Sequence, residues 1–132
     1  MRARFFDLYD RSNPLDGAEV TTSVELSSII DECSAGRAQF CELVGENGFK
    51  LLLGVSRDLG CVQHSSCDDN PPYLMATNNS VLDTDDCVKF LIDNEPTPVP
   101  RHYCLPMELV KKIATHFLEI GQRRTDVRWE EI

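Results

Sequence analysis

Residues 105–130 read LPMELVKKIATHFLEIGQRRTDVRWE, and this stretch decides the fold. Pro106 suits the first turn of a helix, because the N–H group that proline lacks would have no partner there. Gly121 is well placed to cap the other end of that helix in a left-handed conformation. An apolar stripe runs along the helix between Pro106 and Gly121, and the rest of the chain must cover it. Its members are Leu109, Val110, Ile113, Ala114, Phe117, Leu118 and Ile120.

The residues after Gly121 predict a short final strand. The strand is predicted from Thr125 to Trp129, where Val127 and Trp129 lie on one face and Asp126 and Arg128 on the other. A lone tryptophan on a terminal strand usually packs against a neighbouring helix. We therefore expect the Trp129 ring to pack against Ile113 and Phe117.

A first helix is predicted from about Ser23 to Ser34. Thr22 and Glu25 have the spacing of a capping box, in which each side chain bonds the other residue's backbone N–H group. Apolar residues follow at helical spacing. They are Leu26, Ile29, Ile30 and Cys33.

Strand patterns fill most of the remaining chain. Asn47-Gly48 is a strong hairpin signal and joins a strand from Ala38 to Val44 to one from Phe49 to Val55. The second of these is apolar on both faces, which is typical of a central strand covered by a helix. Residues 95–100 carry three prolines, which predict a stiff connector. Further short strands are predicted at Phe5–Tyr9, Cys61–Ser65, Tyr73–Ala76 and Cys87–Ile92.

These elements predict an α+β fold, with an antiparallel sheet of about five or six strands flanked by two main helices. A chain of 132 residues can bury a core of its own, so we expect a single domain over residues 1–132. No stretch approaches the roughly 20 apolar residues that span a bilayer. The basic start of the chain reaches Asp7 before a signal-peptide core forms. We therefore expect a cytoplasmic protein without membrane contact.

The sequence favours a binding protein over an enzyme. No nucleophile-elbow, phosphate-loop or calcium-loop motif is present, and the three histidines lie in unrelated contexts: His64, His102 and His116. No two cysteines have the spacing of structural zinc ligands, so we expect neither a metal nor a cofactor. A metal bound by Cys61, His64 and Cys67 is the alternative, together with a small enzyme built around it. The cysteines are otherwise expected to pack as small apolar side chains.

The formal net charge is −9, which argues against direct binding of nucleic acid. The acidic excess is greatest between Cys67 and Glu95, where seven carboxylates face one lysine, Lys89. Such an excess can simply keep the protein soluble. It can also imitate a polyanion for a basic protein that handles nucleic acid.

The end of the chain resembles immunity protein family one of the bacterial polymorphic toxin systems. The resemblance rests on the proline-led helix, the Gly121-Gln122-Arg123-Arg124 turn and the strand Val127-Arg128-Trp129-Glu130. It covers about the last 30 residues closely and the earlier order of elements only loosely. Arg124 departs from the pattern, because relatives often have proline there. The segment from Cys61 to Cys87 matches nothing in the pattern.

The resemblance implies an α+β protein that binds and inhibits a cognate toxin and catalyses nothing. Such immunity proteins are commonly encoded beside deaminase-type toxins that act on nucleic acid. We expect a monomer that forms a one-to-one heterodimer with a basic toxin and occludes its active-site cleft. An acidic adaptor or regulatory module without a toxin partner is the alternative. The expected toxin interface has two aromatic anchors among loop carboxylates: Asp68, Asp69, Tyr73, Asp83, Asp85, Asp86 and Tyr103.

Overall fold

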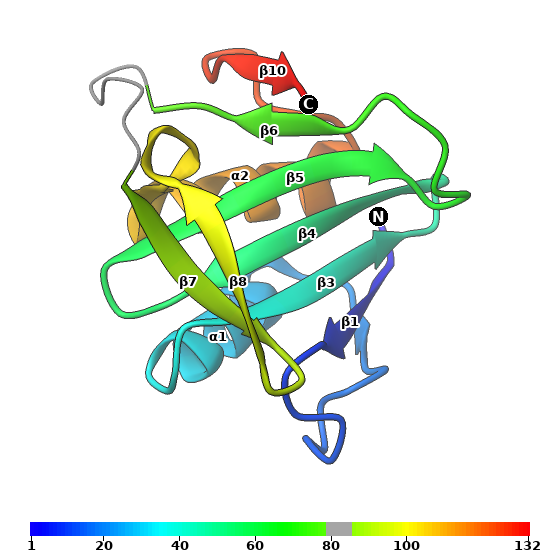
Figure 1. The fold of residues 1–132 in the computed structure, drawn as a ribbon. Helices are drawn as coiled ribbons and strands as arrows, with labels where there is room; N and C mark the ends of the chain where they lie inside the picture. The colour runs from blue at the N-terminus through cyan, green and yellow to red at the C-terminus, as the bar shows by residue number, and fades with distance from the viewer. Residues whose placement is uncertain (79–85) are drawn as a thin grey trace.

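A computed structural model describes residues 1–78 and 86–132 and contains two α-helices and a large sheet (Figure 1). No helix in these two ranges is long and apolar enough to cross a membrane. In chain order the elements are β1 (Ala3–Asp7), β2 (Glu19–Val20), α1 (Ser23–Ser34), β3 (Gln39–Gly45), β4 (Phe49–Val55), β5 (Leu59–Ser66), β6 (Leu74–Ala76), β7 (Cys87–Ile92), β8 (Glu95–Pro100), the 3-10 helix η1 (Arg101–Tyr103), β9 (Leu105–Pro106), α2 (Met107–Ile120) and β10 (Trp129–Glu131).

The sheet runs in the order β10-β6-β5-β4-β3-β1-β2, and β7 joins it beside β3. Its pairings are antiparallel, apart from a single parallel bridge between Gln39 and Leu91. The α+β class and the antiparallel sheet are confirmed. The expected number of about five or six strands is too low, because the described residues alone form ten. Several of the additional strands are only two or three residues long, too short to show an alternating pattern.

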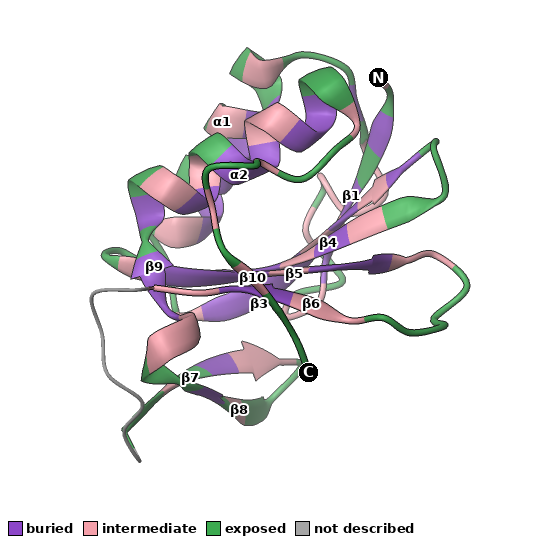
Figure 2. Ribbon diagram, turned by 90° about the horizontal axis from the view of Figure 1, so that it is seen from above, coloured by how far each residue is buried: buried purple, intermediate pink, exposed green. Residues whose placement is uncertain are grey.

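Both helices pack on the same face of the sheet (Figure 2). The main core lies between them and the strands, and α2 contributes Val110, Ile113, Ala114, Phe117 and Leu118 to it. These residues belong to the apolar stripe read from the sequence. The exposed Ile120, at the end of that stripe, is the exception. The helix pair therefore buries the surface that its sequence requires it to bury.

The helix ends follow local chemistry. Thr22 and Glu25 form the expected capping box at the start of α1, and the Glu25 N–H donates to Thr22 Oγ1 over 3.2 Å. Gly121 ends α2 with φ of 81°, the left-handed conformation that glycine adopts at little cost. Pro106 lies one position outside the helix, at the N-cap. The two predicted helices are thus confirmed.

The opposite face of the sheet is half covered by the β7–β8 hairpin, which crosses in front of β3, β4 and β5 in Figure 1. Figure 2 shows the hairpin below the sheet and the helices above it. Between hairpin and sheet lies a second apolar cluster, in which the rings of Phe40 and Phe90 are 5.4 Å apart. Its other buried members are Cys61, Met75, Val99 and Cys104.

The proline segment corrects the sequence interpretation. Residues 95–100 form β8 rather than a mere connector, and they pair with β7 along their whole length. Successive N–H groups of a strand point to opposite edges. Pro96, Pro98 and Pro100 alternate with Thr97 and Val99, so the prolines leave the N–H groups of one edge intact for pairing with β7. The final strand also differs from the prediction, because it begins at Trp129 rather than Thr125.

The hairpin can approach the sheet closely because β4 carries glycine beneath it. A Cβ atom on Gly54 would lie 2.5 Å from Cys61 Sγ and 3.2 Å from the Phe90 ring. We expect Gly54→Ala to lower the free energy of unfolding by about 1–3 kcal/mol, measured by urea denaturation. Gly36→Ala is the matched control, since its Cβ would meet only the Cys33 carbonyl oxygen at 3.7 Å. Equal stability of the two variants would contradict this packing.

Candidate functional site

The β7–β8 hairpin leaves part of the sheet uncovered, to its right in Figure 1. We call this region the open face. It carries side chains that point away from the helices, and none of them lies in the main core. They are Glu42, Lys50, Leu52, Gln63, Glu130 and Ile132.

An apolar groove of about 390 Å³ separates the hairpin from the open face. Its floor includes Phe40 and Leu52, and Val99 of β8 lies on the hairpin side. Tyr103 and Ile132 line it as well. Ile132 remains 59% exposed, so apolar surface beside the groove is open to solvent. The groove therefore offers apolar surface to a partner.

The loop between β5 and β6 holds three of the expected interface residues together. Asp68 and Asp69 are exposed, and Asp68 Oδ1 accepts a hydrogen bond of 3.0 Å from the Asn70 N–H. The Tyr73 hydroxyl donates to the backbone carbonyl of Asp69. The Tyr73 carbonyl in turn accepts from the Ile132 N–H over 3.0 Å, which ties this loop to the open face.

Lys50 does not neutralise this region. Its ammonium lies 2.7 Å from Asp69 Oδ1 and 3.7 Å from Glu42 Oε2, so one cation faces two carboxylates. The hydrogen bond to Asp69 raises the pKa of Lys50, which holds the lysine in its charged form. The carboxylates of the open face and its loop thus remain in excess.

Two further predicted interface residues, Tyr103 and Asp86, belong to η1 and to the residue directly before β7, which starts near the opposite end of β5 in Figure 1. Tyr103 is half-buried in η1, and its hydroxyl donates to Glu130 Oε1 over 3.0 Å. Asp86 is exposed, and its carbonyl accepts from the Arg101 N–H. Asp83 and Asp85 lie outside the described residues. The described members of the predicted set therefore lie in two groups, one in the β5–β6 loop and one beside the start of β7.

Sequence reasoning missed the middle of this surface. Glu42, Lys50 and Leu52 belong to strands that were predicted, and their alternation with buried neighbours was visible. Nothing in the sequence showed that their face would be left uncovered, because this depends on where the hairpin lies. Ile132 and Gln63 were missed for the same reason.

A second hollow, of about 470 Å³, lies at the end of α2 on the helix side of the sheet. We call it the aromatic pocket. Phe49 stacks on His64 with ring centroids 5.1 Å apart, and the Trp129 ring meets His64 edge-on at 6.3 Å. Trp129 packs against the main core, and its indole N–H donates to the Arg124 carbonyl over 3.0 Å. Arg123 lies over the Trp129 ring, 5.8 Å from its centroid.

The possible metal ligands do not converge. Cys61 packs in the cluster under the hairpin, whereas His64 contacts Phe117 on the helix side. The two side chains thus lie on opposite faces of β5, as their odd spacing along a strand requires. Cys67 follows the end of that strand. Within residues 1–78 and 86–132, no three histidine, cysteine or acidic side chains are placed to hold a metal ion.

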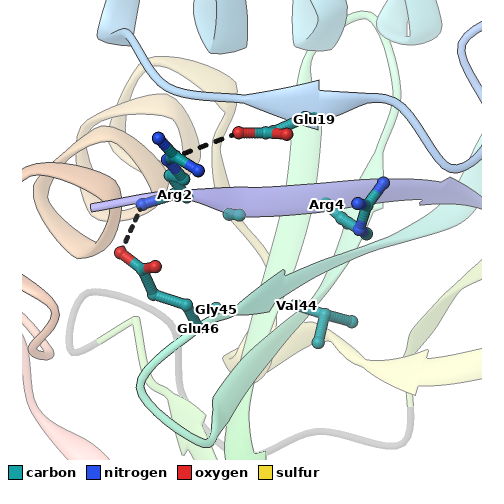
Figure 3. Close-up of a pocket in the computed structure, with 7 residues that line it drawn as sticks. Arg2, Arg4, Glu19, Val44, Gly45 and Glu46 are labelled. Carbon is teal, nitrogen blue, oxygen red and sulfur yellow. Dashed lines mark hydrogen bonds and ion pairs between the residues drawn. The ribbon is translucent and has the colours of Figure 1, made fainter.

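A third hollow, of about 330 Å³, lies where β1 meets the β3–β4 turn (Figure 3). Arg2 lies between two carboxylates there, with its Nε 3.5 Å from Glu19 Oε1 and its backbone N–H donating to Glu46 over 2.8 Å. Arg4 donates to the Gly17 carbonyl. The charged side chains of this hollow already form hydrogen bonds or an ion pair within the protein, and its lining carries less apolar surface than the groove beside the open face.

Burial of His64 makes the folding stability depend on pH. Desolvation, aided by repulsion from Arg123, lowers the pKa of His64 to about 4 from its usual value near 6.5. Below pH 6.5 the unfolded chain takes up a proton that the folded chain refuses, so folding stability falls between pH 6.5 and pH 4. We expect His64→Phe to remove up to about 3 kcal/mol of this loss, measured by denaturation across that range. Parallel pH profiles of variant and wild type would contradict the burial of a neutral imidazole.

Comparison with known protein families identifies the family of this chain. The sequence profile described as Immunity protein Imm1 matches residues 16–131. No curated protein sequence matches the chain. The match begins before α1 and runs through β10, so it includes the aromatic pocket, the C-terminal signature and the open face apart from Ile132. The chain belongs to the Imm1 immunity protein family.

Proposed function

We propose that this immunity protein inhibits its toxin by covering the toxin's active-site cleft with the open face and with the loop between β5 and β6. We call this loop, residues 67–73, the acidic loop. The family implies a toxin partner, and the manner of inhibition is our inference. The observation that carries it is the combination on one face of an apolar groove and carboxylates in excess over Lys50. This surface offers both of the components that tight protein interfaces use.

The two components have different roles. The exposed carboxylates Asp68 and Asp86 lie in the β5–β6 loop and directly before β7, where they attract a basic partner over long range and speed the encounter. The groove, with Tyr103 and Ile132 at its lining, supplies apolar area that loses water on binding and slows dissociation. The hydroxyls of Tyr73 and Tyr103 already bond within the protein, so their rings are held in place before binding.

The chemistry of the surface suits a toxin that acts on nucleic acid. A cleft that binds a polyanion is lined by basic side chains, and an acidic surface can occupy it in the substrate's place. A nucleic-acid deaminase is the toxin class that we propose, on the resemblance of the chain's C-terminal segment. We further propose a one-to-one complex formed in the cytoplasm, in which the immunity protein supplies no catalytic group.

The electrostatic part can be tested by charge reversal. We expect Asp68→Lys combined with Asp86→Lys to slow association with the purified toxin encoded beside this chain by at least about 10-fold at low salt. Added salt should reduce the difference in association rate between the wild type and the double variant, because salt screens exposed charges. The measurement is stopped-flow association at several ionic strengths.

Matched acidic residues on the helices provide the control for the charge reversal. Glu32 and Glu108 are exposed on α1 and α2, so Glu32→Lys with Glu108→Lys changes the net charge equally on the other side of the molecule. A comparable loss of association rate in both double variants would show that only net charge matters. This result would contradict the assignment of the open face as the toxin-binding surface.

The apolar part has a closely matched pair of variants. Ile132 on the open face and Ile120 on α2 are 59% and 58% exposed. We expect Ile132→Asp to speed dissociation of the toxin complex about 10-fold or more, and Ile120→Asp to leave the rate unchanged. Surface plasmon resonance with immobilised toxin measures both rates. A larger effect of Ile120→Asp would place the interface on the helices.

A further inference from the structure

The aromatic pocket contains a cation that is not committed to a carboxylate. Arg124 forms a two-point ion pair with Asp126, through N–O distances of 2.8 and 2.6 Å. Among the described residues no ion pair involves Arg123, which is exposed and lies over the face of Trp129. A planar guanidinium held over an aromatic ring keeps its N–H edges available for a planar anion.

The walls of the pocket are suited to a flat or apolar group. The Phe49 side chain is 43% exposed even though one of its faces is stacked on His64. Val127 and Trp129 line the same hollow and are half-buried. A volume of about 470 Å³ can accept a partner's aromatic side chain together with a short charged neighbour.

The electrostatics favour a carboxylate over a phosphate. The pocket adjoins Gly121, where α2 ends, and the carbonyl end of a helix carries partial negative charge. One unpaired guanidinium balances one negative charge, whereas a phosphate group carries nearly two. The net charge of −9 adds repulsion that grows with the charge of the ligand.

We infer that the aromatic pocket binds an aspartate or glutamate of the partner protein, with Arg123 as its ion-pair partner and a neighbouring aromatic side chain against Phe49 and Trp129. The identification of the partner as the toxin rests on the proposed function. The pocket itself is a second contact of opposite charge to the open face. Such a contact fixes the orientation of the partner, because a reversed complex would oppose like charges.

One partner can reach both contacts. Phe49 pairs with Ser66 across β4 and β5, and the Cys67 N–H donates to the Gly48 carbonyl over 2.8 Å. The acidic loop therefore starts at the end of the sheet where the aromatic pocket lies. A toxin that binds around this end of the sheet would contact carboxylates on the open face and Arg123 on the helix side of the sheet.

The test uses short peptides and the single tryptophan of the chain, which lies in the pocket. Its indole N–H gives one cross-peak in a proton–nitrogen correlation spectrum. We expect N-acetyl-Asp-Phe-amide to shift this cross-peak saturably, with a dissociation constant on the order of 1 mM. The neutral N-acetyl-Asn-Phe-amide should bind at least about 10-fold more weakly, because it lacks the charge.

Two arginine variants complete the test. Arg123→Gln should lower the affinity of the protein for the acidic peptide at least about 10-fold, whereas Arg128→Gln should leave this affinity unchanged. Arg128 is an exposed arginine of the same segment that does not line the pocket, so it controls for net charge. Circular dichroism checks that both variants remain folded.

Three results would overturn the inference: no saturable shift, equal affinity for the acidic and neutral peptides, or an unchanged affinity in Arg123→Gln. Adenosine monophosphate serves as the phosphate-bearing probe, and tighter binding of this nucleotide than of the acidic peptide would assign the pocket to nucleotides instead. The titration contains no toxin. Its failure would leave the proposed role of the open face standing, and failure of the open-face variants would leave the pocket unaffected.

Discussion

The central strands β3, β4 and β5 are covered by the helices on one face and, over part of their length, by the hairpin on the other, and this two-sided burial is the constraint on which the rest of the structure depends. Leu43, Leu51 and Leu53 point to the helices, while Phe40 and Cys61 point to the hairpin. Burying apolar side chains on both faces roughly doubles the area that the central strands remove from water. The helices and the hairpin are the two covers that this pattern requires.

Burial on both sides also explains the cysteines of the central strands, Cys41 and Cys61. Desolvation raises the pKa of Cys41 well above its usual value and that of Cys61 to about 12. Thiols that remain protonated are poor nucleophiles and poor metal ligands. Small apolar side chains fit between closely packed layers, as Cys61 does beside Gly54. Cys61, one of the two cysteines that suggested metal chemistry in the sequence, therefore acts as a packing residue.

The two covers differ in extent, and the difference has a functional consequence. The helices cover their face of the central strands, whereas the narrower hairpin leaves the open face beside it. The family signature has a double role under the proposed mechanism. Gly121 and Trp129 complete the architecture at the end of α2, and with Arg123 they also shape a pocket of opposite charge. Architecture and recognition thus share residues at this end.

Local interactions explain which features the sequence alone determined. The capping box at Thr22, the apolar stripe of α2 and the Gly121 cap involve residues at most a few turns apart, and the Asn47-Gly48 hairpin is equally local. Propensity and periodicity are therefore enough to predict them. The signature at the end of the chain also identified the family correctly, because its residues are contiguous.

Only the tertiary structure decided which surface is available for binding. The pairing of Lys50 with Asp69, the contact of Tyr103 with Glu130 and the pocket around Arg123 join residues that are distant in the sequence. β8 was missed because proline disfavours strands in general, and only its position at an edge makes its alternating prolines harmless. Long-range packing sets these contacts, so no local pattern encodes them.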